Sequence, residues 1–523
     1  MTRVFPLEKN NNPQNVILVI NKRPWPATFI KFAKFHEIKI INNYFSYHLI
    51  RKDITIFFFQ IRNVFLHIFK FILFKKIITN DNHKIFINGK DQISFLPHYH
   101  SDFFWYSESK INPENIIYDT NTKEAYRFLI NNGIKGSLNY FKKNKFSYQY
   151  SNLPIKFLNG NIHNTEVNFQ ILDYKNTYDK WLNYMIKNNI KIIFDWYKFN
   201  NHNFAIYDAI RKNNGISIFH QVAFSGKIDR GQQFISDINL SYFNFSYKIE
   251  KKNKSNFYLN LITGHQKKNN IELIKSKSQK LRDKLISNGA KKIICLFDEG
   301  SANSRWCNGR GHDFFRENYL KTLQAVLKNH NLGLIIKPKK SFDFIKKTLG
   351  SIFELYLEAI KTKRVIFLEN KEKNIYSNYH PLYAALASDL AIHSHLIAGT
   401  AGIESALEKI PTILINREED VANNLCELPK NKIVFDNWDN ALEAASEFLF
   451  KENNANEFGN WDRYLGEYDP FMDNNGALRV QEVIENSINL FGRKYSSKEI
   501  IMKIADQYSG KYGKDKVFKN FNF

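Results

Sequence analysis

The stretch that decides the fold is "SDLAIHSHLIAGTAGIESALEKIPTILIN", residues 388–416. An apolar run ending at His393 and Ser394 leads into a turn of small residues, a helix-compatible segment and a second apolar run, "PTILIN". Short, unbroken apolar strands that alternate with helices are typical of a parallel sheet covered on both faces. The stretch therefore predicts a strand–helix–strand unit with polar side chains gathered at its turn.

The same alternation extends in both directions along the chain. Downstream and upstream of the turn, the expected strands are "KIICLFDEG" (292–300), "LGLIIKPKK", "RVIFLEN" and "KIVFD", and the expected helices are "NYLKTLQAVLKNH" and "NALEAASEFLF". A second series begins with an early strand in "NVILVINKRPW". It continues with a strand in "KIIFDWY" (191–197), a helix in "NFAIYDAIRKNNG" and a strand in "ISIFHQVAFSG" (216–226). The two series predict two parallel sheets, each built from strand–helix–strand units.

Between the two series, residues 250–285 are polar and charged, which predicts a linker followed by an exposed helix. The fold class predicted is α/β, with two Rossmann-like domains facing across a cleft. The expected domains are residues 1–265 and residues 266–490; the resemblance described below implies that the first is the acceptor side and the second the donor side. Residues 491–523 are expected to form a C-terminal tail or helix.

Composition limits the class of protein. The chain has 523 residues, more than one ordinary core accommodates, and its hydrophobic content of 43% excludes a disordered class. The formal charge of +24 would suit nucleic acid or an anionic membrane. However, the chain is also rich in Asn, Ile, Phe and Tyr, as A/T-rich coding produces, and no compact Lys/Arg block or RNP-like motif occurs, so we expect no nucleic-acid partner.

Two features bear on where the protein works. The three cysteines, Cys295, Cys307 and Cys426, are widely spaced, and residues 1–15 lack the apolar core of a signal peptide. Both features favour a reducing, cytoplasmic location.

The segment "ITIFFFQIRNVFLHIFKFILFKK", which begins at Ile54, raises the question of membrane contact. Its polar residues recur every three or four positions: Gln60, Asn63, His67 and Lys70. The segment is therefore either a core helix whose polar stripe meets solvent, or a helix that lies on the inner face of an anionic membrane through Lys75 and Lys76.

Polar side chains collect where strands of the second series end, and ligands bind there in open parallel sheets. The candidate ligand-binding residues, which the resemblance described below assigns to a sugar donor, are Asp298, Glu299, Lys337, Lys339, His393, Ser394, Thr400, Gly402 and Glu404. Small residues before a helix let backbone N–H groups approach an anion, so Thr400 is either a phosphate ligand or a helix cap. Glu404 is placed to accept from a sugar or ribose hydroxyl, and Lys337 and Lys339 would neutralise a diphosphate.

No GxGxxG or P-loop fingerprint follows either first strand, and no DxD or HExxH suggests a metal site. The group His98, His100 and Asp102 lies in an aromatic segment and is more typical of surface or core packing than of a metal site.

Over roughly residues 190–490 the chain resembles GT-B glycosyltransferases of bacterial capsule and lipopolysaccharide assembly. The resemblance rests on "IKPKK", "SDLAIHSHLIAGTAGIESALEKIPTILI" and "YDPFMDNNGALRVQEVIENSINLF". It implies metal-independent transfer of a sugar from a nucleotide-activated donor, held by the C-terminal half, to a glycan or lipid-linked glycan. It implies no cofactor, and gives Lys337 to the donor phosphate, Thr400 and Gly402 to the diphosphate and Glu404 to a donor hydroxyl.

The chain departs from this pattern in two places. Lys337-Pro338-Lys339 stands where many relatives have His-Pro, so the nucleotide is not implied. Asn474-Asn475-Gly476 follows Asp473 where Asp-Gly is usual, which leaves the role of Asp473 open.

An inverting transfer also needs a base from the N-terminal half. Asp195 and His220 lie at expected strand ends and are the catalytic candidates, with Asp102 as a third. A turn cap for Asp195 and a core or donor contact for His220 remain alternatives. Two other functions also remain open: a sugar-nucleotide epimerase-like enzyme and a non-catalytic glycan-assembly protein.

Overall fold

The computed structural model describes residues 17–19, 39–41, 83–88, 102–106, 108–120, 122–138, 162–196, 198, 202–224, 226, 228, 232–265, 271–298, 311–368, 379–396, 399–417, 423–451 and 457–520. The chain forms two compact units. The first comprises Met1–Lys84, Asn139–Lys191 and Asn200–Gly215, and the second comprises the remainder.

In the first unit, β1 (Ile17–Val19) pairs in parallel with β2 (Lys39–Ile41). The early strand expected in "NVILVINKRPW" therefore exists as β1, but it belongs to a separate two-stranded sheet. This unit also contains the long helix α5 (Ile162–Lys187), which contacts α6 (Asn203–Lys212).

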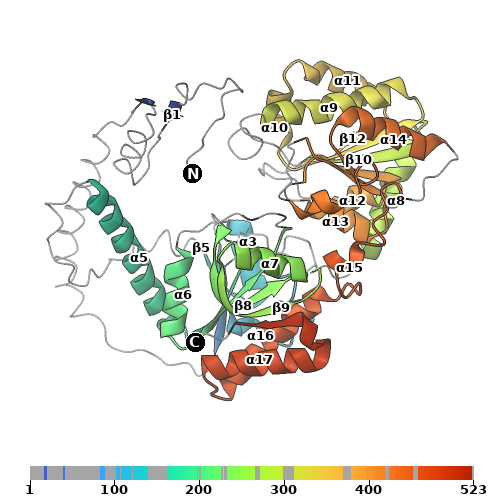
Figure 1. Cartoon of the computed structure of the whole chain (residues 1–523). Helices are drawn as coiled ribbons and strands as arrows, with labels where there is room; N and C mark the ends of the chain where they lie inside the picture. The colour runs from blue at the N-terminus through green and yellow to red at the C-terminus, as the bar shows by residue number, and fades with distance from the viewer. Residues whose placement is uncertain are drawn as a thin grey trace. The chain divides into compact units, whose positions relative to one another are not determined.

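The C-terminal half of the second unit is built on a six-stranded parallel sheet (Figure 1). Its strands, in chain order, are β10 (Lys292–Asp298), β11 (Leu332–Pro338), β12 (Val365–Phe367), β13 (Leu390–His393), β14 (Thr412–Ile415) and β15 (Val434–Phe435). Their spatial order is β12-β11-β10-β13-β14-β15, so the chain reverses direction across the sheet between β10 and β13. This is the doubly wound order of a Rossmann-like sheet.

The apolar runs of this sheet are continuous because both faces are covered. One face packs Ile294, Leu296, Leu334 and Ile336 against helices that include α9 (Gly311–Lys328) and α14 (Trp438–Phe450). The other face packs the alternate residues Ile293, Cys295, Phe297 and Ile335 against α8 (Ile271–Ile286), α12 (Pro381–Ala385) and α13 (Thr400–Leu407). Successive side chains point to opposite faces, so a strand buried on both sides has no polar alternation.

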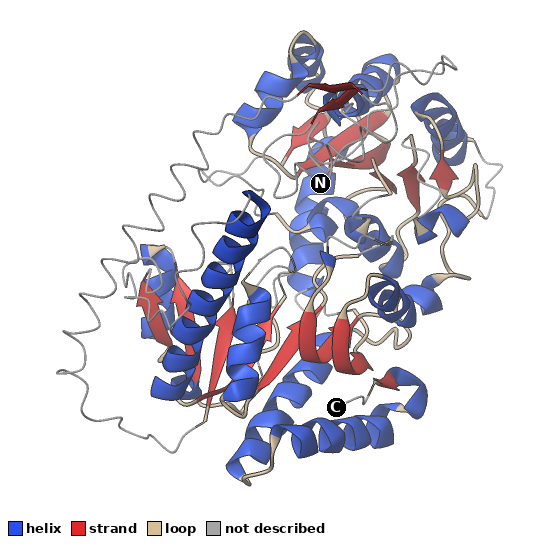
Figure 2. Ribbon diagram, turned by 60° about the vertical axis from the view of Figure 1, so that its left-hand side comes forward, coloured by secondary structure: helices blue, strands red, loops and turns tan. Residues whose placement is uncertain are grey.

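The helices α10 (Phe342–Leu349) and α11 (Ile352–Lys361) complete the cover of the first of these faces. In Figure 2 the strands of this sheet lie between layers of helix.

The other large sheet has the order β16-β9-β8-β7-β6-β3-β4-β5. Its strands are β3 (Lys84–Asn88), β4 (Ile116–Thr120), β5 (Lys135–Leu138), β6 (Ile190–Asp195), β7 (Ile216–His220), β8 (Ile235–Ser241), β9 (Asn256–Ile262) and β16 (Val517–Lys519). The last strand, β16, runs antiparallel to β9. Helices α3 (Lys123–Asn131) and α7 (Asn244–Lys252) lie between its strands in the sequence.

The C-terminal helices pack on this eight-stranded sheet, which is called the first large sheet below because its strands begin earlier in the chain; the six-stranded sheet is called the second sheet. Apolar residues of α16 (Gly476–Gly492) and α17 (Ser497–Tyr512) share one buried core with β4, β6, β7, β8 and β9. Both helices are drawn in red beneath β8 and β9 in Figure 1. The expected donor-side range, residues 266–490, thus includes α16, which packs on the other sheet. The boundaries of the domains remain predictions.

The α/β class with two Rossmann-like parallel sheets is confirmed, since both sheets have the predicted strand–helix alternation. One local prediction is right only in part: the helix expected within residues 250–285 exists as α8, but the segment before it is not a linker. This range contains the end of α7 and the buried strand β9 before α8 begins. The charged residues that suggested a linker, Lys251 and Lys252, are the exposed last turn of α7.

The segment from Ile54, with Lys75 and Lys76, lies outside the described residues, as do His98, His100 and Cys307. Among the helices that the structure describes, none is long and apolar enough to span a bilayer.

Candidate functional site

The candidate site lies at the carboxyl ends of β10 and β13, the two neighbouring strands between which the strand order of the six-stranded sheet reverses. Here β10 ends at Asp298 and its neighbour β13 ends at His393, with Phe297 and His393 in register. In doubly wound sheets this switch point is where ligands bind. The sequence predicted both residues as donor contacts. Glu299, the third residue expected at this edge, lies outside the described residues.

Both predicted residues make contacts within the protein. The Asp298 carboxylate accepts a hydrogen bond of 3.0 Å from the Tyr319 hydroxyl of α9, and both side chains are buried. Burial raises the pKa of Tyr319, and the neighbouring Asp298 raises it further, so this hydroxyl keeps its proton and donates. His393 is buried, with Nδ1 2.6 Å from the His395 carbonyl oxygen, and Ser394 donates to the Phe297 carbonyl at 3.0 Å.

The loop after β13 leads into α13, whose N-cap is Gly399 and whose first residue is Thr400. The Thr400 hydroxyl oxygen accepts a hydrogen bond of 2.8 Å from the backbone N–H of Phe224, in the segment that follows β7. Thr400 is therefore not the N-cap, and it joins α13 to the first large sheet. A hydroxyl that accepts one hydrogen bond still has its own proton to donate to an anion.

Gly402 lies inside the first turn of α13. A Cβ at this position would stand 3.0 Å from Leu414 and 3.4 Å from the Cβ of His393. The glycine therefore allows close packing of the helix on β13 and β14. A phosphate contact for its backbone remains a prediction.

Glu404 is fully buried, and the groups around it come from the first large sheet. Its Oε1 lies 3.5 Å from Nε2 of His265, which follows β9. The ring of Tyr242, which follows β8, packs on the His265 imidazole with 4.7 Å between centroids. Burial raises the pKa of the Tyr242 hydroxyl well above its usual value, and the Glu404 carboxylate raises it further.

An imidazole, a carboxylate and a phenol thus meet at the start of α13. Sequence reasoning missed His265 and Tyr242 because it placed His265 in a linker. The signal for His265 was the apolar run "FYLNLI" of β9, which ends at Ile262, three residues before His265.

The two lysines lie near this edge of the sheet. Lys337 is the penultimate residue of β11, half-buried, and its ammonium donates to the Pro338 carbonyl at 3.0 Å. Lys339 follows the strand and is also half-buried. In register, Lys337 pairs with Phe297 and Phe297 with His393. Lys337 and His393 therefore lie on one face, two strands apart.

The candidate bases belong to the first large sheet. Asp195 ends β6, and its carboxylate accepts a 2.7 Å hydrogen bond from the N–H of Trp196, as a turn cap would. His220 is buried, and its ring stacks on Phe194 with centroids 4.5 Å apart. The structure thus places His220 among aromatic rings, and a role in proton transfer for either residue remains a prediction.

The third candidate, Asp102, is also buried. Its carboxylate accepts hydrogen bonds from the Tyr118 hydroxyl at 2.6 Å and from the Trp196 indole at 3.0 Å. These two hydrogen bonds hold the Asp102 carboxylate in place beside β4 and β6, which gives the residue a structural role.

The contact between Thr400 and Phe224 gives a testable prediction. We expect Thr400→Val to reduce the free energy of unfolding by about 1–3 kcal/mol, because a buried N–H loses its acceptor while the shape is kept. Thr400→Ser, which keeps the hydroxyl, is the control and should lose much less. Denaturant unfolding of the full chain measures both, and equal stability of the two variants would contradict the contact.

No family model and no curated protein sequence match this chain. Solved structures with a similar course of the chain include a putative UDP-N-acetylglucosamine 2-epimerase from Listeria monocytogenes (TM-score 0.44, 10% identity, 78% of this chain and 96% of that chain). Anabaena Alr3699/HepE, in complex with UDP and glucose, aligns with a TM-score of 0.40, 13% identity and coverage of 81% and 98%.

CalG4, the calicheamicin glycosyltransferase, aligns with a TM-score of 0.40, 9% identity and coverage of 79% of this chain and 99% of that chain. At these values the likenesses establish neither the activity nor the ligand of this chain.

Proposed function

We propose that this protein is a glycosyltransferase that moves a sugar from a nucleotide-activated donor to a surface-glycan or lipid-linked glycan acceptor. The observation that supports the proposal is that side chains of α13, in the C-terminal half, contact residues of the N-terminal half. Thr400 and Glu404 of the C-terminal half contact Phe224 and His265 of the N-terminal half. A transfer between ligands held by two halves needs such a meeting point.

In this proposal the donor phosphates lie at the N-terminal end of α13. The backbone N–H groups of its first turn and the Thr400 hydroxyl bind the phosphate oxygens. Lys337 and Lys339 add positive charge, which stabilises the leaving nucleotide as the bond from the anomeric carbon to the phosphate oxygen breaks. Glu404 accepts a hydrogen bond from a donor hydroxyl, and His265 orients its carboxylate.

The acceptor hydroxyl attacks the anomeric carbon. As its oxygen forms the new glycosidic bond, its proton passes to a base of the N-terminal half, for which Asp195 and His220 are the proposed residues. The cations and the helix terminus provide the charge that the leaving group needs, so the proposal includes no metal and no cofactor. A peripheral location on the inner face of the cytoplasmic membrane remains part of the proposal, because the acceptor is expected to be lipid-linked.

One observation favours a second candidate, an epimerase that acts on a nucleotide-sugar. The His265 imidazole and the Glu404 carboxylate form an adjacent acid–base pair, and an epimerase must remove and return a proton on one sugar.

A single assay separates these functions. The full chain is incubated with UDP-, GDP- and CMP-sugars, with and without a glycan acceptor, in the presence of EDTA, and nucleotide release and sugar identity are measured. We expect acceptor-dependent nucleotide release that EDTA does not reduce. Interconversion of the donor sugar without an acceptor would support the epimerase instead, and no turnover of any donor would reject both enzymes.

A further inference from the structure

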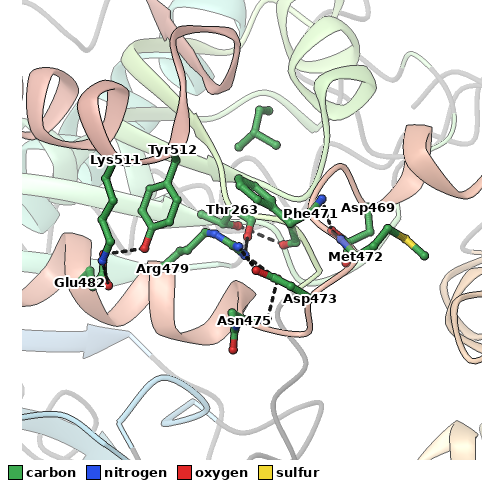
Figure 3. Close-up of polar contacts among 12 residues, drawn as sticks. Thr263, Asp469, Phe471, Met472, Asp473, Asn475, Arg479, Glu482, Lys511 and Tyr512 are labelled. Carbon is green, nitrogen blue, oxygen red and sulfur yellow. Dashed lines mark hydrogen bonds and ion pairs between the residues drawn. The ribbon is translucent and has the colours of Figure 1, made fainter.

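The closing segment of the donor-side sequence, residues 469–479, does not reach the switch point but contacts the backbone that carries His265. Arg479, in the first turn of α16, is buried, and its Nη1 donates to the Thr263 carbonyl at 3.1 Å. The same guanidinium binds the Asp473 carboxylate through both terminal nitrogens. Figure 3 shows Arg479 reaching Asp473 and Thr263 together.

The guanidinium is also fixed by aromatic rings. Its Cζ lies 3.5 Å from the centroid of the Phe471 ring and 5.1 Å from that of Tyr512. Burial works against the charged form of Asp473, but hydrogen bonds from Arg479 and Asn475 outweigh it and lower the pKa of Asp473. The Asp473 carboxylate is therefore ionised at neutral pH. A planar, forked and stacked cation is a geometry that lysine does not reproduce.

A second carboxylate holds the next part of the same backbone. Asp469 is buried and accepts hydrogen bonds from the N–H groups of Phe471, Met472 and His265. Gly264 lies between Thr263 and His265 with φ of +75°, and a Cβ there would stand 2.8 Å from Asp469 Oδ1. Only glycine adopts this conformation readily at so close an approach.

Gly476, the first residue of α16, also packs against the backbone of His265. A Cβ on Gly476 would stand 2.1 Å from the His265 carbonyl oxygen, so the helix begins directly against that peptide. The His265 ring, in turn, packs on Tyr242 and approaches Glu404. The backbone of His265 is thus fixed by the closing segment, and its imidazole contacts the residue proposed to bind the donor.

We propose that Arg479 and Asp473 are positioning residues, which hold Thr263–Gly264–His265 so that the His265 imidazole meets Glu404. The inference rests on the proposed function for its catalytic consequence, but the positioning itself is a statement about this chain alone. It assigns a role to Asp473, which the sequence had left open, without a contact to ligand. The insertion Asn474-Asn475-Gly476 then supplies the turn that brings Gly476 onto His265.

The test compares three full-length variants. Arg479→Lys and Asp473→Asn weaken the contact with Thr263, and Asp473→Asn is the milder because this side chain is 37% exposed. Lys511→Met is the matched control: it removes an ion pair with Glu482 between α16 and α17, the same two helices, in a side chain that is 57% exposed (Figure 3). Exposed pairs of this kind contribute little to stability.

The first measurement needs no donor. Each variant is labelled with [¹³Cε1]histidine, and the His265 resonance is identified by its loss in His265→Gln. We expect this resonance to move in Arg479→Lys and Asp473→Asn and to stay in place in Lys511→Met, at a temperature where melting curves show all three folded. An unmoved resonance in both of the first two variants would overturn the inference, as would global unfolding of Asp473→Asn.

The second measurement uses the donor that the wild type turns over. We expect kcat to fall about tenfold in Arg479→Lys and Asp473→Asn while KM for the donor changes by less than about twofold, with no change in Lys511→Met. Equal kcat in all four proteins would overturn the catalytic part. Failure of the wild type to turn over any donor would reject the proposed function, and the resonance of His265 would still decide the positioning.

Discussion

Glu404→Gln is expected to lower turnover of the donor by about 100-fold or more while the thermal midpoint moves by less than about 3 °C. Glutamine has the same size and shape as glutamate, so the fully buried site stays filled. The substitution removes only the negative charge beside His265, together with the ability to accept at both oxygens. Melting curves and initial rates of the purified full chain measure the two effects separately.

Two further variants complete this experiment. Glu408→Gln, at the half-buried C-cap of α13 four residues after Glu404, is the matched control and should keep the wild-type rate. Glu404→Ala is expected to cost about 2–5 kcal/mol of stability, because truncation of a fully buried side chain leaves a cavity. A wild-type rate in Glu404→Gln would exclude Glu404 from donor binding.

Gly476→Ala is expected to destabilise the protein by about 1–3 kcal/mol and also to reduce turnover strongly. The new Cβ would stand 2.1 Å from the His265 carbonyl oxygen and 2.6 Å from its carbon, so α16 or the His265 peptide has to move. Neither neighbour is a flexible side-chain end that yields easily. Denaturant unfolding and the donor assay measure the two losses.

The same helix provides the control. Gly492, the last residue of α16, is a position where a Cβ would meet no heavy atom of the described residues within 4 Å. Gly492→Ala should therefore leave turnover unchanged and alter stability by no more than a gain of about 0.5–1 kcal/mol, the ordinary preference for alanine in a helix. Similar losses in both variants would show that the close approach of Gly476 to His265 has no special effect.

Much of the second sheet follows from local sequence. Each of its strands is a short apolar run between turn residues, and burial on both faces removes the need for alternation, so periodicity and length suffice to find β10, β11, β13 and β14. The strand ends then identify Asp298, Lys337 and His393 as residues of one edge. The same reasoning failed for β9 because a charged helix end precedes it and masks its six-residue apolar core "FYLNLI".

What the sequence by itself determined is the set of strands and helices and the polar residues at the strand ends. These depend on neighbours within one strand–helix–strand unit. Only the tertiary structure decided that His265 meets Glu404, that Phe224 donates to Thr400, and that the closing segment returns to Thr263. Each of these contacts joins segments far apart in the chain, and their approach is set by the packing of α13 and α16, which no local pattern of residues encodes.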